Sequence, residues 1–113
     1  EAETLDLNTQ DYRYIGYFTN LRKSIELVWN YPGSAARRGI SGTVHVKFII
    51  SKEGSVTDIE VLQSSGYMIL DSSILDAIRM ASPFAPLPDG FGKQRLVIKG
   101  AFVYVINGFG STY

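Results

Sequence analysis

The C-terminal stretch GAFVYVINGFGSTY, residues 100–113, contains no charged side chain. Within it, residues 102–106 (FVYVI) are all of types that favour β-strands. An uncovered strand edge recruits other chains, so small soluble domains usually protect a segment of this kind. Either a neighbouring element covers this strand, or pairing with another molecule is its purpose.

Apolar residues nearer the N-terminus follow a helical period. From Tyr14 to Val28 they recur at steps of four, three, four and three, which places them on one face of a helix. Pro32 biases the residue before it away from helical angles, so the helix is expected to end near Trp29 or Asn30.

Two strands, a second helix and a last strand follow. Alternating apolar and polar residues predict strands at 43–50 and 56–63, with Gly54 in the turn between them. A helix is predicted over residues 68–81, because the proline-rich segment SPFAPLPDGFG that comes next cannot continue it. The last predicted strand runs from about Arg95 to Asn107.

These elements predict an α+β domain in the order helix, strand, strand, helix, strand. The first two strands form a hairpin, and the second helix crosses over to place the third strand beside the first. The result is a three-stranded antiparallel sheet in the order two, one, three, with both helices packed on one face and the third strand left as an edge. The predicted core comprises Val44, Val46, Phe48, Ile59, Val61, Ile74 and Ile78.

Length and charge limit the classes of function. The 113 residues fit one domain, expected over residues 11–113, with residues 1–10 as a flexible lead-in. Eleven basic and eleven acidic residues give a formal net charge of zero. No long-range field therefore favours nucleic acid or anionic lipid as a partner.

Candidate catalytic and metal-binding residues are few. The single histidine, His45, lies on the polar phase of a strand, and there is no cysteine, so no metal site or cofactor is predicted. Ser64 and Ser65 are interpreted as a turn, because no G-x-S-x-G sequence surrounds them. Asp58 and Glu60 are interpreted as a solvated strand face. The chain is predicted not to be an enzyme.

One enzymatic alternative stays open at this point, a small α+β enzyme of acylphosphatase-like size. Such an enzyme needs an anion-binding loop with a positioned arginine, and Arg37 and Arg38 lie in a glycine-bounded connector. The arginine doublet by itself is too small to bind nucleic acid.

Several stretches resemble the C-terminal domain of TonB-type energy transducers, over about residues 14–107. The shared pattern begins with Tyr31-Pro32, followed by a connector of small residues and arginines and by Gly-x-Val-x-Val-x-Phe at residues 42–48. It continues with Val-x-Asp, Ser-Ser-Gly, Leu-Asp, Ala-Ile-Arg and Pro-Phe-x-Pro-Leu-Pro in that order. The order and spacing of the motifs carry the resemblance more than any single motif does.

The resemblance implies a non-catalytic periplasmic domain of a protein anchored in the bacterial inner membrane by an N-terminal helix, with a proline-rich spacer between them. An ExbB–ExbD-type motor would act through that anchor and supply work from the proton gradient. The domain would capture the TonB box, a short extended segment of an outer-membrane receptor, by β-strand addition, and so drive uptake of nutrients such as siderophores.

The resemblance also implies where the partner binds. The receptor segment is expected to lie beside the last strand, with a second contact at the Tyr-Pro pair. Pro32 is expected to direct the chain path first, whereas Tyr31 is assigned equally to structure and to receptor contact. The implied partner-binding residues are Tyr31, Pro32, Lys99, Ala101, Phe102, Val103, Tyr104, Val105, Ile106 and Asn107.

The sequence departs from the family pattern at one place, and two other partners are compatible with it. Well-studied members carry a polar, glutamine-containing stretch before the Tyr-Pro pair, whereas here Val28 and Trp29 stand there. The same fold also occurs in TolA-like and other envelope or sensor proteins with different partners. An uncovered edge can also pair with itself, so a homodimer is a further alternative.

Overall fold

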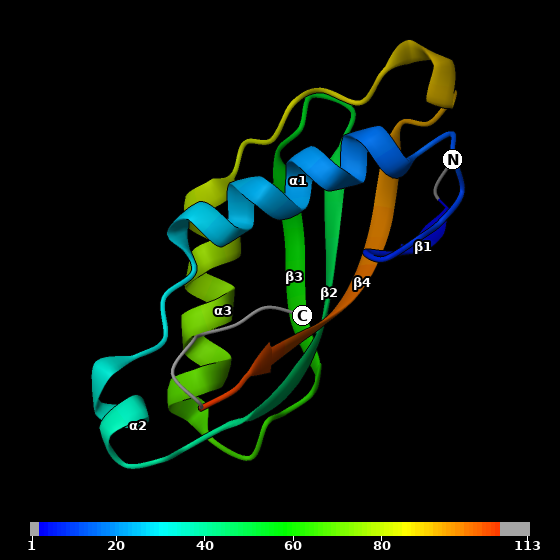
Figure 1. Cartoon of the computed structure of the whole chain (residues 1–113). Helices are drawn as coiled ribbons and strands as arrows, with labels where there is room; N and C mark the ends of the chain where they lie inside the picture. The colour runs from blue at the N-terminus through cyan, green and yellow to red at the C-terminus, as the bar shows by residue number, and fades with distance from the viewer. Residues whose placement is uncertain (1–2, 107–113) are drawn as a thin grey trace.

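The computed structural model describes residues 3–106 (Figure 1). In chain order its elements are β1 (Thr4–Asp6), α1 (Ile15–Val28), α2 (Gly33–Arg37), β2 (Gly42–Ser51), β3 (Val56–Gln63), α3 (Met68–Ala81), a short 3-10 helix η1 (Asp89–Phe91) and β4 (Arg95–Tyr104). The predicted helices and strands are present, and β1, α2 and η1 are additional.

The strands form one sheet in the order β1-β4-β2-β3. β2 is antiparallel to both β3 and β4, and its register with β4 runs from Gly42 opposite Tyr104 to Ser51 opposite Arg95. The predicted order of the last three strands is therefore confirmed. The sheet is four-stranded and mixed, however, because β1 pairs in parallel with β4, which corrects the prediction of a three-stranded antiparallel sheet.

β1 also changes the interpretation of residues 1–10, which were expected to be a flexible lead-in. Leu5 and Leu7 alternate with polar neighbours, and Leu7 is only 2% exposed. Gly100 leaves room for it, since a Cβ atom at Gly100 would lie 3.0 Å from Leu7 Cδ2. The segment from Thr4 to Leu7 thus packs as part of the domain.

Both long helices cover the same face of the sheet, and Figure 1 shows no helix over the other face. The apolar face of α1 supplies Phe18, Leu21 and Ile25 to the core, all at most 2% exposed. Of the predicted core, Val44, Val46, Phe48, Ile74 and Ile78 are buried, as expected. Ile59 and Val61 are only partly buried, because they lie on β3, an edge of the sheet.

The proline-rich segment after α3 is held by backbone contacts to the tip of the β2–β3 hairpin. The Phe84 N–H donates to the Gly54 carbonyl oxygen at 2.8 Å, and the Leu87 N–H donates to the Lys52 carbonyl oxygen at 2.8 Å. These bonds lead the chain across the end of the sheet, so that β4 can return beside β2. β4 begins at Arg95, as predicted.

Candidate functional site

β4 is the strand on which the candidate site depends. Its side chains alternate between the core and the helix-free face, because successive residues of a strand point to opposite sides. Leu96, Ile98, Phe102 and Tyr104 are buried. Lys99 is exposed, and Ala101 and Val103 are partly buried on the helix-free face.

The outward-facing backbone groups of β4 follow from two hydrogen bonds to β1. The Val97 N–H donates to the Glu3 carbonyl oxygen at 2.9 Å, and the Leu7 N–H donates to the Lys99 carbonyl oxygen at 2.7 Å. Backbone groups alternate along a strand, so the N–H and C=O of Ala101 and Val103 point to this same outer side. Those of Phe102 and Tyr104 point toward β2.

Beyond Lys99, no strand of the described residues 3–106 pairs with the outer side of β4. The expectation that nothing else in the chain covers this edge is therefore wrong for Val97–Lys99, where β1 lies. Within residues 3–106, the outer side of β4 is left without a paired strand at Ala101 and Val103. Because the main-chain groups of a strand edge pair with an extended segment, this part of β4 can accept an added strand.

A groove lies where β1 ends, on the helix-free face of the sheet. Its volume is about 840 Å³, and it reaches from β1 and the turn after it to the sheet surface. Leu7 and Asn8 form one side, and His45 and Leu62 belong to the neighbouring strands. Ala101 also lines the groove, so the groove and the open edge are continuous.

Tyr31 and Pro32 lie in a different setting, beneath the end of β4. The Tyr31 hydroxyl donates a hydrogen bond to the Ile40 carbonyl oxygen, and its ring packs edge-on against Tyr104 with 5.3 Å between centroids. Burial raises the pKa of the Tyr31 hydroxyl. The Pro32 carbonyl accepts the Ala36 N–H at 3.0 Å and so begins α2.

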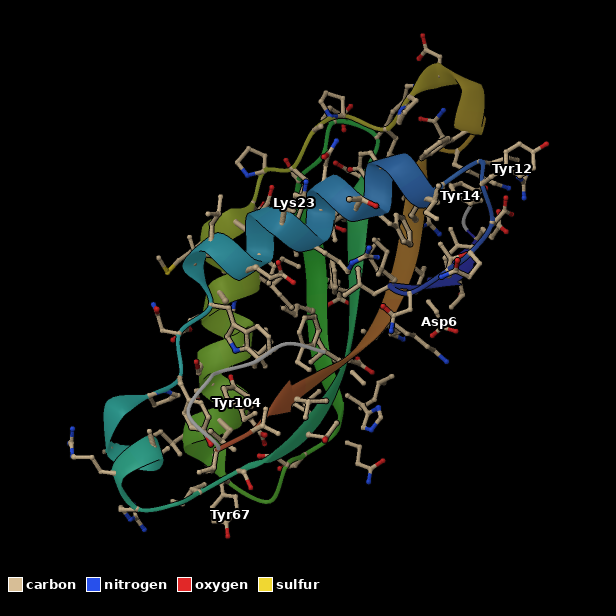
Figure 2. All side chains as sticks on the ribbon, viewed as in Figure 1. Asp6, Tyr12, Tyr14, Lys23, Tyr67 and Tyr104 are labelled. Atoms are coloured by element: carbon tan, nitrogen blue, oxygen red, sulfur yellow. The ribbon has the colours of Figure 1, made fainter. Side chains whose placement is uncertain are left out.

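Tyr104 joins this connector to β4 and α3. Its hydroxyl accepts a hydrogen bond from Trp29 Nε1 at 2.8 Å and donates one to the Leu70 carbonyl oxygen at 2.9 Å. Figure 2 shows Tyr104 near the end of β4 beside α3. Trp29 also packs edge-on against Phe102, at 5.5 Å. The structure thus joins Tyr31 with two of the predicted β4 residues on the core side.

The remaining predicted residues lie at the end of β4 or past it. Val105 and Ile106 are exposed and follow the last residue of the strand. The predicted strand end at Asn107 is therefore three residues too late, and Asn107 lies outside the described residues. Neither β1 nor its groove was predicted from the sequence. Their signal was the alternation of Leu5 and Leu7 with polar residues in a very short segment.

The serine turn has a structural explanation. Asp71 accepts hydrogen bonds from the Ser64 hydroxyl and from both the N–H and the hydroxyl of Ser65, the latter two at 3.0 and 2.8 Å. Burial acts to raise the pKa of Asp71, but these hydrogen bonds outweigh it and lower the pKa. The serines therefore close the turn that precedes α3.

The described residues 3–106 hold neither a metal-binding cluster nor a membrane-spanning helix. In that part of the chain no group of three or more His, Asp or Glu side chains is placed to hold a metal ion. None of the helices described there is long and apolar enough to cross a membrane. Arg37 and Arg38 are exposed at the end of α2.

Several known proteins with similar sequences are named Protein TonB. Protein TonB of Helicobacter pylori strain J99 is 40% identical over 73 residues, which are 65% of this chain and 26% of that protein. Protein TonB of Haemophilus influenzae is 31% identical over 90 residues, 80% of this chain and 33% of that protein. The chain thus spans about a quarter to a third of the length of the curated relatives that it matches.

Solved structures agree with these relatives. The NMR structure of a Helicobacter pylori TonB C-terminal domain has a TM-score of 0.70 and 32% identity, covering 83% of this chain and 84% of that one. The Pseudomonas aeruginosa TonB C-terminal domain has a TM-score of 0.56 and 28% identity, covering 72% and 81%. TolAIII, solved with a peptide derived from the N-terminus of TolB, has a TM-score of 0.59 over 80% and 74%, but at 23% identity it shows the fold alone.

The family model described as Gram-negative bacterial TonB protein C-terminal matches residues 29–106, which include the Tyr-Pro connector, the β2–β3 hairpin, α3 and β4. The match leaves out β1 and the whole of α1. Because it covers more than half of the sequence, the chain belongs to the TonB C-terminal domain family.

Proposed function

We propose that this chain is the non-catalytic docking domain of a TonB-type energy transducer, and that it captures the TonB box of an outer-membrane receptor by strand addition to β4. The observation that carries the proposal is that, beyond the end of β1, no described strand pairs with the outward-facing N–H and C=O groups of Ala101 and Val103. Family membership supports the class of protein, and the open edge supports the mode of binding.

Strand addition at this edge has an expected strength. Each main-chain hydrogen bond contributes about 0.5–1.5 kcal/mol net, and the two outward-facing residues offer only a few such bonds. The affinity is therefore expected to be weak, no tighter than micromolar, since a micromolar dissociation constant already corresponds to about 8 kcal/mol. Side chains at alternate positions of the added strand supply specificity. A pull on the receptor segment loads the hydrogen bonds along the strand.

The other candidate residues divide by role. Tyr31, Phe102 and Tyr104 act indirectly, because their ring contacts hold the end of β4 in place. Pro32 acts through the chain path, because its carbonyl accepts the Ala36 N–H and so begins α2. Lys99 flanks the open edge, and its side chain is exposed on the helix-free face. In this proposal Val105, Ile106 and Asn107 continue the docking segment past β4.

The proposal includes the rest of the transducer. The domain would work in the periplasm, joined through a proline-rich spacer to an inner-membrane anchor helix and an ExbB–ExbD-type motor. Proton-gradient-derived force would then reach receptors for siderophores or other nutrients. The support is family membership, together with relatives that extend well beyond the matched part.

A proline scan of β4 tests the docking edge. Proline removes a backbone donor and harms the ladder that the donor serves. Ala101→Pro and Val103→Pro should remain folded by circular dichroism yet lose a synthetic TonB-box peptide of a receptor from the same organism. The matched controls Phe102→Pro and Tyr104→Pro should unfold the domain. If the folded outward-facing variants bind the peptide normally by calorimetry, the edge is not the docking site.

Two other partners could use the same open edge. A second copy of the chain could pair through β4, and sedimentation would then show a dimer that Ala101→Pro dissociates. The other candidate is a partner of the kind that TolA-like proteins bind, since TolAIII, solved with a peptide derived from the N-terminus of TolB, has a similar fold. Binding of the TonB-box peptide with no response to a TolB N-terminal peptide favours the transducer.

A further inference from the structure

We propose that β1 is a stop that sets where the docking strand ends: it occupies the outer side of β4 as far as Lys99, so a receptor segment pairs only from Ala101 onward. This inference rests on the proposed function and adds to it the length and register of the docking edge. The partner is an extended peptide segment, since the groups left open are main-chain donors and acceptors.

β1 occupies the ladder groups that an added strand would otherwise use. Thr4 lies opposite Val97, and Asp6 lies opposite Lys99. The outward Val97 N–H and Lys99 C=O already bond to the chain around β1, at 2.9 and 2.7 Å. A strand that paired along the whole of β4 would therefore have to displace β1.

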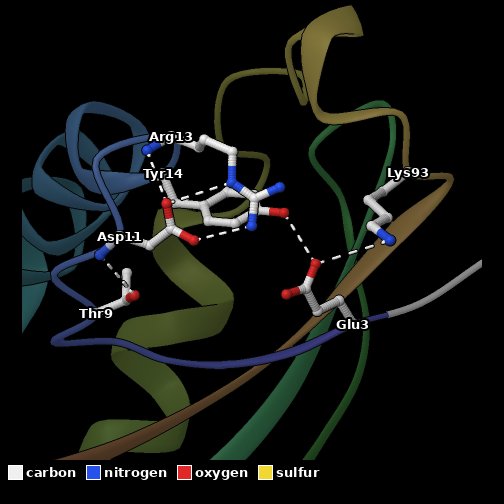
Figure 3. Close-up of polar contacts among 6 residues, drawn as sticks. All are labelled: Glu3, Thr9, Asp11, Arg13, Tyr14 and Lys93. Atoms are coloured by element: carbon white, nitrogen blue, oxygen red, sulfur yellow. Dashed lines mark hydrogen bonds and ion pairs between the residues drawn. The ribbon is translucent and has the colours of Figure 1, made fainter.

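Contacts outside the ladder hold β1 in this position. On its N-terminal side, the Glu3 carboxylate accepts a hydrogen bond from the Tyr14 hydroxyl at 2.9 Å and lies 3.7 Å from Lys93 Nζ (Figure 3). On its C-terminal side, Arg22 donates to the Leu7 carbonyl oxygen at 2.9 Å, and the Leu7 side chain is buried. Displacing β1 would break these contacts as well as the ladder.

The turn after β1 marks the boundary. The Thr9 N–H donates to the Asp6 carbonyl oxygen at 2.9 Å, so the chain leaves the edge of the sheet just beyond Leu7. The groove of about 840 Å³ opens at this point, lined by the turn, by His45 and by Ala101. One end of a strand added at Ala101 would reach the turn after β1. The groove provides space for that end on the helix-free face.

Two proline variants test whether β1 limits the length of the strand that can pair with β4 or merely lies beside it. Glu3 and Leu7 bond to β4, so by alternation the Leu5 N–H also faces β4, whereas the Thr4 N–H faces away. Leu5→Pro should release β1 from the ladder, and Thr4→Pro is the matched control that should leave it paired. Both are made in the 113-residue chain.

The probes are two synthetic TonB-box peptides of one receptor, of about seven and twelve residues at about 3.3 Å per residue, so that the shorter peptide already matches the length of residues 101–107. In the wild type and in Thr4→Pro the two peptides should bind within twofold of each other, because residues past the stop cannot pair. In Leu5→Pro the longer peptide should bind at least threefold more tightly than the shorter one. Hydrogen exchange followed by NMR should show new protection of Ala101 and Val103 in every folded variant, and peptide-dependent protection of Lys99 and Val97 only in Leu5→Pro.

The wild type alone also decides the matter if Leu5→Pro does not fold. Faster exchange of the Leu7 N–H on peptide binding would mean that β1 is displaced, which overturns the stop. A clear advantage of the longer peptide in the wild type would overturn it as well. Unchanged Leu7 exchange with protection confined to Ala101 and Val103 supports it. If neither peptide binds any folded form, the proposed docking function itself fails, and the stop fails with it.

Discussion

At the scale of single residues, Gly54 is under the strongest geometric constraint. It lies at the tip of the β2–β3 hairpin with φ at 98°, a value that side chains with a Cβ atom rarely adopt. A Cβ atom at this position would lie 2.1 Å from the Phe84 carbonyl oxygen. The hairpin and the segment after α3 can therefore approach this closely only because residue 54 is glycine.

Gly54→Ala should lower the free energy of unfolding by about 2–5 kcal/mol, because a left-handed alanine costs about 1–2 kcal/mol and the overlap adds about 1–3 kcal/mol. Gly66→Ala is the matched control, since Gly66 has φ at 94° and nothing within 4 Å of an added Cβ atom. It should cost only the backbone part. Urea unfolding of both variants measures the difference. Equal losses would show that the Phe84 carbonyl moves aside freely.

At the scale of elements, the connector between α1 and β2 is joined to the end of β4 by aromatic side chains. Trp29 and Tyr31 both pack edge-on against Tyr104, at 5.2 and 5.3 Å between centroids. Edge-on aromatic pairs of this kind contribute about 0.5–1.5 kcal/mol beyond the area that they bury. Tyr31 therefore packs against the end of β4 from the core side, and this geometry favours the structural interpretation of Tyr31.

Tyr31→Ala should lower the free energy of unfolding by about 2–4 kcal/mol, because a half-buried ring and its hydrogen bond to Ile40 are both lost. Tyr31→Phe keeps the ring and should cost about 1 kcal/mol. Affinity for the TonB-box peptide, measured at a temperature where each variant is folded, should change less than twofold. Lost affinity at unchanged melting temperature would instead make Tyr31 a receptor contact.

At the scale of the whole molecule, one core joins the helix layer to the sheet. Phe48, in the middle of β2, is fully buried and lies opposite Ile59 on β3 and Ile98 on β4. A small domain with a single core of this kind unfolds as one cooperative unit. The docking edge is therefore expected to lose its structure together with the rest of the domain.

Phe48→Ala should lower the free energy of unfolding by about 3–5 kcal/mol, because it leaves a cavity in the core. Thr57→Ala, at an exposed position of β3, is the control and should change it by less than about 0.5 kcal/mol. Trp29 is the single tryptophan, so its fluorescence reports on the connector beside β4. Fluorescence and circular dichroism should follow one transition. Separate transitions would contradict a single cooperative core.

Local patterns in the sequence were sufficient for most of the elements. The helical period predicted α1, Pro32 predicted its end at Val28 to within two residues, and the residue types around 68–81 predicted both ends of α3. Alternation predicted β2 and β3. These predictions succeeded because each element buries one face against the same core, so the spacing of its apolar residues shows both its type and its buried face.

The sequence by itself determined that β4 lies beside β2 and that the C-terminal half of β4 is uncharged. It left open whether a neighbouring element or another molecule covers this strand, because an uncovered edge recruits other chains. Only the tertiary structure decided which part of that edge is open and which backbone groups face outward. Those two properties depend on the pairing of β1 with β4, between residues more than ninety positions apart in the chain. A three-residue strand is too short for its alternation of apolar and polar residues to predict this pairing. Leu7 is buried only because Gly100, which has no side chain, lies against it.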